Sequence, residues 1–271
     1  MKLSAFFALI FLAFIATSCN VTESIVFNEA MGGDYKTTFD FSSMLAMAKE
    51  GRPDSVEREA KEVIDTTIVF DEFFEKFKDS IAALPKEKRD ELKAMTGIVL
   101  DIHMDEEKGI FNFTMNKPFS DFKELKAINE QLDGAMDIAQ SFGKKDAAGG
   151  PPEDQMDELT KTDPIIYSFT NNTFTRFQPK KDEVSDETEE GEEDLESSDA
   201  DAMNEMIKVQ FEEMFKQANY TMRYTFPKPI KSVSNKNAVL SEDKKTMTLQ
   251  INMSDSNKDA TLMDLEVILE D

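Results

Sequence analysis

The chain is poor in the residue types on which many enzyme sites depend. Its 271 residues include one cysteine, one histidine and no tryptophan. One cysteine cannot form an intramolecular disulfide or a zinc site built from several thiolates. A histidine-based catalytic triad would have to use His103. We therefore expect a protein that is not an enzyme and that carries no cofactor.

Basic residues are also scarce. The chain has 31 Lys and Arg residues against 55 Asp and Glu residues, which gives a formal net charge of -24. Nucleic-acid binding needs a basic surface, so the balance excludes a nucleic-acid partner. Residues 181–201 are the extreme case, because all but the first of them, residues 182–201, contain twelve acids and no base. Such a segment buries too little apolar surface to fold, and it predicts a disordered acidic linker or insertion.

Long apolar runs are absent except at the start of the chain. Lys2 precedes an apolar stretch at residues 5–16, and small residues follow it. This pattern is typical of a secretory signal peptide, and the stretch is too short to span a bilayer as a helix.

The residues that end this stretch, Ala16-Thr17-Ser18-Cys19, resemble a lipobox, the lipidation motif of bacterial lipoproteins. The resemblance implies cleavage between Ser18 and Cys19, with palmitate-type chains on Cys19 and the lipid bilayer as a partner. Residues 1–18 would be the signal peptide and 19–23 a lipidated tether. The chain looks like a Bacteroidota-type lipoprotein of the cell envelope, on the periplasmic face of the outer membrane rather than the cell surface.

Apolar and polar residues alternate in several segments, which predicts β-strands. Tyr35, Thr37, Phe39 and Phe41, for example, fall on one face of a strand. Turn residues join the segments into three hairpins, and single strands follow near the C-terminus. The predicted hairpins are 24–41, 98–116 and 164–178, and the single strands are 220–226, 247–253 and 265–269.

Helical spacing of Phe, Leu, Ile and Met predicts amphipathic helices at 71–84, 86–95, 121–142 and 203–218. Residues 54–67 are polar and fit an exposed helix or loop. Helices interspersed with antiparallel hairpins favour an α+β fold, with the helices packed on one face of a sheet. Residues 24–180 would form the α+β domain. Residues 202–271 would complete the same domain or form a small C-terminal unit.

The C-terminal stretch also carries a resemblance. Tyr224-Thr-Phe-Pro-Lys-Pro-Ile-Lys-Ser-Val-Ser-Asn235, followed by Asp243-Lys-Lys-Thr-Met-Thr-Leu249, is similar to LppM-type envelope domains. The similarity covers about thirty residues and includes no chemical motif. It implies an envelope module and no particular activity.

Asp101, His103 and Asp105 form the one constellation with a metal-binding pattern. They alternate along a predicted strand, so their side chains share a face, and imidazole and carboxylate both bind divalent metals. The wet face of an antiparallel strand has the same appearance. We expect a solvated face and keep a metal site as the alternative.

The sequence thus predicts a membrane-anchored, non-enzymatic lipoprotein that binds a protein partner or an apolar ligand near the membrane. One alternative is a carboxylate- or metal-dependent hydrolase, since paired acids are abundant. Another is a structural spacer whose acidic segment serves as an interaction loop.

Overall fold

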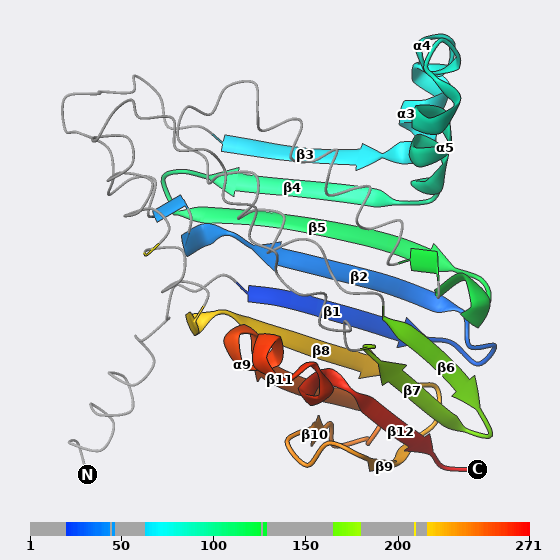
Figure 1. The fold of residues 1–271 in the computed structure, drawn as a ribbon, viewed down its shortest axis with the longest axis vertical. Coiled ribbons are helices and arrows are strands. Elements are labelled where there is room, and N and C mark those ends of the chain that lie inside the picture. The colour runs from blue at the N-terminus through cyan, green and yellow to red at the C-terminus, as the bar shows by residue number, and fades with distance from the viewer. Residues whose placement is uncertain are drawn as a thin grey trace, which may run out of the picture.

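The computed structural model of the chain describes residues 20–43, 45–46, 63–125, 127–128, 165–179, 209 and 216–271. The expected signal peptide, Ser18, Cys19 and the acidic segment lie outside these residues. So do most of the helix expected at 121–142 and most of that at 203–218. Two β-sheets contain most of the regular secondary structure of the described residues (Figure 1).

The larger sheet has eight strands in the order β10-β11-β8-β1-β2-β5-β4-β3. Their bounds are β1 Asn20–Phe27, β2 Gly33–Asp40, β3 Val63–Val69, β4 Val99–Asp105, β5 Ile110–Phe119, β8 Asn219–Thr225, β10 Val239–Leu240 and β11 Thr246–Asn252. β1 pairs antiparallel with β2 and parallel with β8. The first strand of the described chain therefore lies inside the sheet, beside a strand from near the C-terminus.

The smaller sheet has four strands in the order β6-β7-β12-β9. They are β6 Ile166–Thr170, β7 Thr173–Phe177, β9 Ile230–Val233 and β12 Leu265–Leu269. The chain passes from β8 in the larger sheet to β9 in the smaller one and returns at β10. The C-terminal strands thus belong to both sheets and do not form a sheet of their own.

The three predicted hairpins are confirmed as β1–β2, β4–β5 and β6–β7. Alternation explains them, since Tyr35, Thr37, Phe39 and Phe41 are all buried. The turn between β6 and β7 consists of Asn171 and Asn172, which have φ of 53° and 61°. Asparagine tolerates this left-handed conformation, and two such residues in succession make the tight turn that suits a hairpin.

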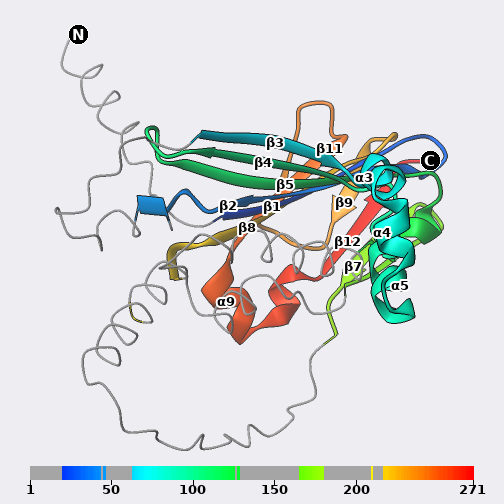
Figure 2. The same ribbon diagram turned by 90° about the horizontal axis from the view of Figure 1, so that it is seen from above.

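The two sheets lie face to face (Figure 2). Aromatic side chains pack between them. Phe174 of β7 lies between the sheets, with ring centroids 5.4 Å from Phe27, 5.4 Å from Tyr224 and 5.5 Å from Phe226. Such edge-on contacts add to the stabilisation that burial of the rings provides. The core of this half of the molecule is therefore the space between the sheets.

This architecture corrects the predicted α+β fold. A second sheet, not a layer of helices, covers the larger sheet around β1 and β8. The alternation of apolar and polar residues predicts strands with one apolar face, but it does not indicate whether helices or a second sheet cover that face. Here β6, β7, β9 and β12 bring apolar faces of their own, so the described core is a β-sheet pair.

The described helices are short and connect strands. α3 Phe70–Lys76, α4 Lys78–Ala82 and α5 Lys86–Ala94 form a helical arm between β3 and β4, while α9 Met253–Lys258 and the 3-10 turn η2 Ala260–Met263 follow β11. The helix expected at 71–84 is interrupted at Phe77, whose φ of -111° is not helical. We expected residues 54–67 to form an exposed helix or loop, but those from residue 63 onward belong to the edge strand β3. Their β-branched Val, Ile and Thr residues explain β3.

The start of β1 also differs from the expectation. We placed the strand at residue 24 after a tether, whereas β1 begins at Asn20. Val21, Glu23, Ile25 and Phe27 are buried on one face, and the strand pairs with β2 on one side and with β8 on the other. The residue after Cys19 is thus already part of the sheet.

Candidate functional site

The residues of the alternative metal site, Asp101, His103 and Asp105, share the strand β4 but have separate partners. Asp101 accepts a hydrogen bond of 2.6 Å from Thr67, and His103 Nδ1 lies 3.9 Å from Asp65 Oδ1. Asp105 accepts hydrogen bonds from the backbone N–H and the Nζ of Lys108, which lower the pKa of its carboxyl group. Among the described residues, no group of three His, Cys, Asp or Glu side chains is placed to hold a metal ion.

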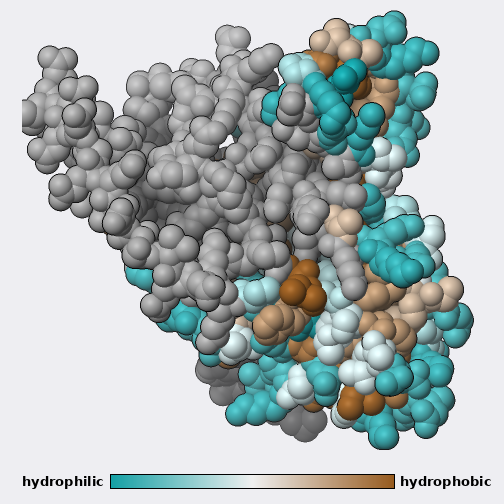
Figure 3. All heavy atoms as spheres, turned by 45° about the vertical axis from the view of Figure 1, so that its right-hand side comes forward, coloured by the Kyte–Doolittle hydropathy of each residue, from teal (hydrophilic) through white to brown (hydrophobic). Residues whose placement is uncertain are grey.

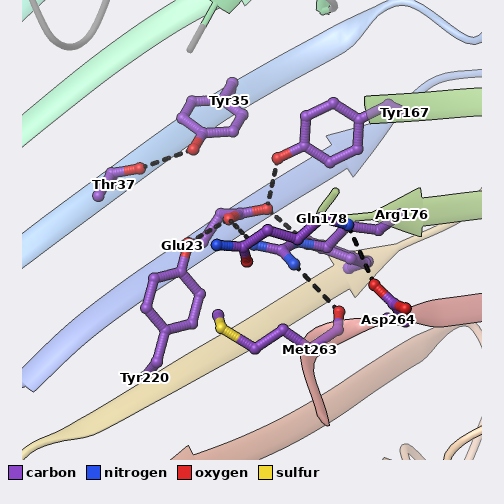
Figure 4. A network of polar contacts seen from close by, with 10 residues as sticks. Glu23, Tyr35, Thr37, Tyr167, Arg176, Gln178, Tyr220, Met263 and Asp264 are labelled. Carbon is purple, nitrogen blue, oxygen red and sulfur yellow. Dashed lines mark hydrogen bonds and ion pairs between the residues drawn. The ribbon is translucent and has the colours of Figure 1, made fainter. Parts of the chain in front are cut away.

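A buried polar cluster lies between the two sheets, where sequence reasoning placed no site (Figure 4). Its centre is an ion pair between Glu23 of β1 and Arg176 of β7, with Oε2 and Nη2 3.6 Å apart and both side chains fully buried. Arg176 also donates a hydrogen bond of 3.0 Å to the backbone carbonyl of Met263. The pair therefore joins the larger sheet to the smaller one and to the turn before β12.

All four tyrosines of the chain lie close to this pair. The hydroxyls of Tyr167, Tyr220 and Tyr224 donate hydrogen bonds to Glu23, and Tyr35 accepts one from Thr37. Burial raises the pKa of each of the four phenols, and the charge of Glu23 raises it further. The tyrosines therefore remain protonated donors, which a buried carboxylate needs.

Arg176 is charged for a related reason. Burial by itself lowers the pKa of the guanidinium group, but the negative charge of Glu23 opposes this effect, and the pKa lies well above the usual value. Its guanidinium carbon lies 5.8 Å from the ring centroid of Tyr220. The cluster is closed to solvent, so we interpret it as a device that fixes the two sheets to each other rather than as a binding site.

The candidate binding site is a groove on the outer face of the larger sheet, the face turned away from the smaller sheet. The groove has a volume of about 480 Å³ and crosses β10, β11, β8 and β1. Its lining consists of Ser24, Val26, Arg223, Thr225, Val239, Leu240, Ser241, Thr246 and Thr248. Val239 is 68% exposed, Val26 47% and Leu240 37%, so the groove presents apolar side chains to solvent.

Hydrogen bonds hold the hairpin that forms one wall of the groove. The N–H of Ser241 donates to the carbonyl of Thr246, and the N–H of Thr246 donates to the hydroxyl of Ser241, both at 2.9 Å. Asp243 accepts from the hydroxyl of Ser241 and the N–H of Lys245, which lowers its pKa. The wall is therefore defined before a ligand arrives.

The groove carries charge opposite to that of the chain. Residues 219–252 contain six basic and two acidic residues, although the whole chain has a net charge of -24. Arg223 lies in the groove, and Lys36 of β2 lies beside Ser24 on the same face. Both are exposed, and among the described residues neither forms an ion pair with a carboxylate.

A second exposed apolar region lies on the helical arm. Phe77 is 40% exposed and Leu84 is 39% exposed. Figure 3 shows brown apolar atoms on this arm, at the top of the view, framed by hydrophilic ones. Its charges are mixed along α3 to α5, so this region has apolar surface without the charge bias of the groove.

No family model, curated protein or solved structure matches the chain. Within the part of the chain that the structure describes, no helix is long and apolar enough to cross a membrane.

A sequence signal existed for each of the two sites. Glu23 interrupts the apolar face Val21, Ile25 and Phe27, and an acid in such a row calls for a buried partner. For the groove, the signal was the run of basic residues after residue 219 in an acidic chain. Neither signal identifies the residues that complete the site, because these residues come from strands far apart in the sequence.

Proposed function

We propose that the chain is a membrane-anchored, non-enzymatic lipoprotein of the cell envelope that binds a protein partner in the groove. Lipidated Cys19 would attach it to the membrane, with the periplasmic face of the outer membrane as its location. The partner would be bound near the end of β1 that lies away from the bilayer.

The observation that carries this proposal is the path of β1. The strand begins at Asn20, directly after Cys19, and Val26, near its other end, lines the groove. Six residues of strand cover about 20 Å at roughly 3.3 Å per residue. A lipid on Cys19 would therefore hold one end of the sheet at the membrane and present the groove about 20 Å from it.

The filled space between the sheets favours a protein partner over an apolar ligand. Tyr35, Tyr167, Phe174 and Tyr224 are at most 2% exposed, and they occupy the region in which a ligand pocket of a two-sheet fold would lie. The groove instead is open, elongated across strands, and lined by both polar and apolar groups. This composition suits a protein segment, which offers both kinds of contact.

Membrane attachment is tested by replacing Cys19 with serine. We expect Cys19→Ser to move the protein from the membrane fraction to the soluble fraction, because serine cannot form the thioether that carries the lipid. Fractionation followed by metabolic labelling with an alkyne fatty acid measures both attachment and lipidation. The matched control is Ser18→Ala, which keeps a small residue before the cysteine and should remain attached. Unchanged attachment of Cys19→Ser would refute the lipid anchor.

Partner binding is tested by a photo-crosslinking residue in place of Val239 in intact cells. We expect a discrete adduct, because Val239 lines the groove. The control is the same residue in place of Val63, a valine of similar exposure (63% against 68%) at the opposite edge of the same sheet. Adducts of equal yield at both positions, or at neither, would argue against the groove as the binding site.

A further inference from the structure

The groove contains a straight row of side chains that cross-strand pairing places on one face. Val239 pairs with Thr248, Thr248 with Arg223, Arg223 with Ser24, and Ser24 with Lys36. Directly paired residues of neighbouring strands point to the same side of a sheet. The row therefore runs perpendicular to the strands, from an apolar end at Val239 through Arg223 to Lys36.

The spacing of this row is regular. Val239 and Arg223 are two strands apart, and so are Arg223 and Lys36. Neighbouring strands lie about 4.8 Å apart, so each interval is about 9.6 Å. Thr248 and Ser24 occupy the intervening strands with short polar side chains, which leave room for a chain lying along the row.

A polyproline II helix matches this spacing. It rises about 3.1 Å per residue with three residues per turn, so residues three apart project from one side at intervals of about 9.3 Å. A β-strand does not fit, since residues three apart point to opposite faces. Val239 lies at one end of the row, so the first of the three positions suits an apolar residue. Arg223 and Lys36 occupy the other two positions, which therefore suit acids.

Charge along the next row limits where an acid can lie. Asp34 of β2 pairs with Val26 of β1 and is exposed on the same face. Its carboxylate disfavours an acidic ligand group over Val26, whereas Arg223 and Lys36 favour one over their own row. The negative charges of a ligand are therefore expected along the row of Arg223 and Lys36, and not along the neighbouring row of Val26 and Asp34.

We infer that the groove binds a partner's polyproline II segment with the pattern apolar-x-x-acid-x-x-acid. The apolar residue contacts Val239, the first acid pairs with Arg223, and the second acid pairs with Lys36. This inference rests on the proposed function for the place of binding and adds the chemistry of the bound segment. It names a conformation and a spacing, and both can be varied in a synthetic peptide.

The test is a fluorescence-polarisation titration of the full chain in detergent with a labelled peptide, Leu-Pro-Pro-Glu-Pro-Pro-Glu. We expect saturable binding that weakens as salt rises, because exposed ion pairs are screened. A peptide with Gln in place of both Glu residues should bind at least about fivefold more weakly. So should Leu-Pro-Glu-Pro-Glu-Pro-Pro, which keeps the composition but changes the spacing.

Protein variants identify the contacts. We expect Arg223→Gln to weaken binding about fivefold, and the double variant Arg223→Gln with Lys36→Gln to weaken it further. Lys231→Gln is the matched control, because it removes a charge from the same basic stretch but lies on β9 of the smaller sheet. Its affinity should stay within about twofold of the unaltered chain. Thermal unfolding of each variant shows that the exposed substitutions leave the fold intact.

Three results would overturn the inference. They are equal affinity for the peptides with correct and altered spacing, an unchanged affinity in Arg223→Gln, and binding that appears only after the twelve acids between residues 182 and 201 are replaced. The last result would mean that the acidic segment of the chain itself occupies the groove. The Cys19→Ser and Val239 crosslinking experiments do not depend on the peptide. They test the proposed function separately, so failure of the inference is distinguishable from failure of the proposed function.

Discussion

Replacing Arg176 with methionine should cost about 3 to 5 kcal/mol of the free energy of unfolding. Methionine has a similar length and no charge, so the substitution leaves the carboxylate of Glu23 buried without its cation. The carbonyl of Met263 loses its hydrogen bond from Arg176 at the same time. Since small domains are stable by only about 5 to 15 kcal/mol, this loss would populate the unfolded state measurably.

Urea denaturation followed by tyrosine fluorescence measures this effect directly. The chain has no tryptophan, and its four tyrosines all belong to the buried cluster, so the signal reports the cluster itself. Arg223→Met is the matched control. It makes the same chemical change at an exposed arginine and should stay within about 0.5 kcal/mol of the unaltered chain.

A second substitution separates loss of charge balance from loss of packing. In the double variant Glu23→Gln with Arg176→Met, the amide oxygen still accepts hydrogen bonds from the tyrosines, but no charge is buried. We expect it to be more stable than Arg176→Met alone by about 2 kcal/mol, because the unpaired charge is gone. If the double variant were the less stable of the two, the ion pair would not be the main contribution of Arg176.

Alanine at Gly33 is the other substitution with a large expected effect. A Cβ atom at this position would lie 1.9 Å from the backbone oxygen of Val26, so β1 and β2 would have to separate. We expect a loss of about 3 kcal/mol or more, because a backbone atom cannot move aside as a flexible side chain can. Thermal unfolding of the full chain gives the measurement.

Gly109→Ala provides the comparison for Gly33→Ala. Gly109 has a φ of +67°, but a Cβ atom there meets nothing within 4 Å. Alanine should cost about 1 kcal/mol at Gly109, from the left-handed conformation alone. A loss at Gly33 no larger than that at Gly109 would show that the two strands have room for a methyl group.

The hairpins were predictable because their signals are local. Alternation and a turn such as Asn171-Asn172 lie within about fifteen residues of sequence, and β1–β2, β4–β5 and β6–β7 followed from them. The order of the strands was not predictable in this way. The parallel pairing of Ile25 with Tyr224 joins residues 199 positions apart, and no turn encodes it.

The sites depend on the same non-local order. Arg176 lies on the buried face of β7, where its alternation with Phe174 indicates burial but not the identity of its partner. Glu23 becomes that partner only when the smaller sheet covers β1. Likewise, Val239, Arg223 and Lys36 form one row only because β10, β11, β8, β1 and β2 are neighbours in that order.

The position of β1 has a mechanical consequence under the proposed anchorage. A pull on the lipid would be transmitted along the axis of β1, whereas the hydrogen bonds to its neighbours run across that axis. The bonds to β2 and β8 would then share the load in shear, and they would have to fail together rather than one after another. The sheet would resist tearing from the membrane end, and a force on the bound partner would reach the bilayer without unravelling the fold.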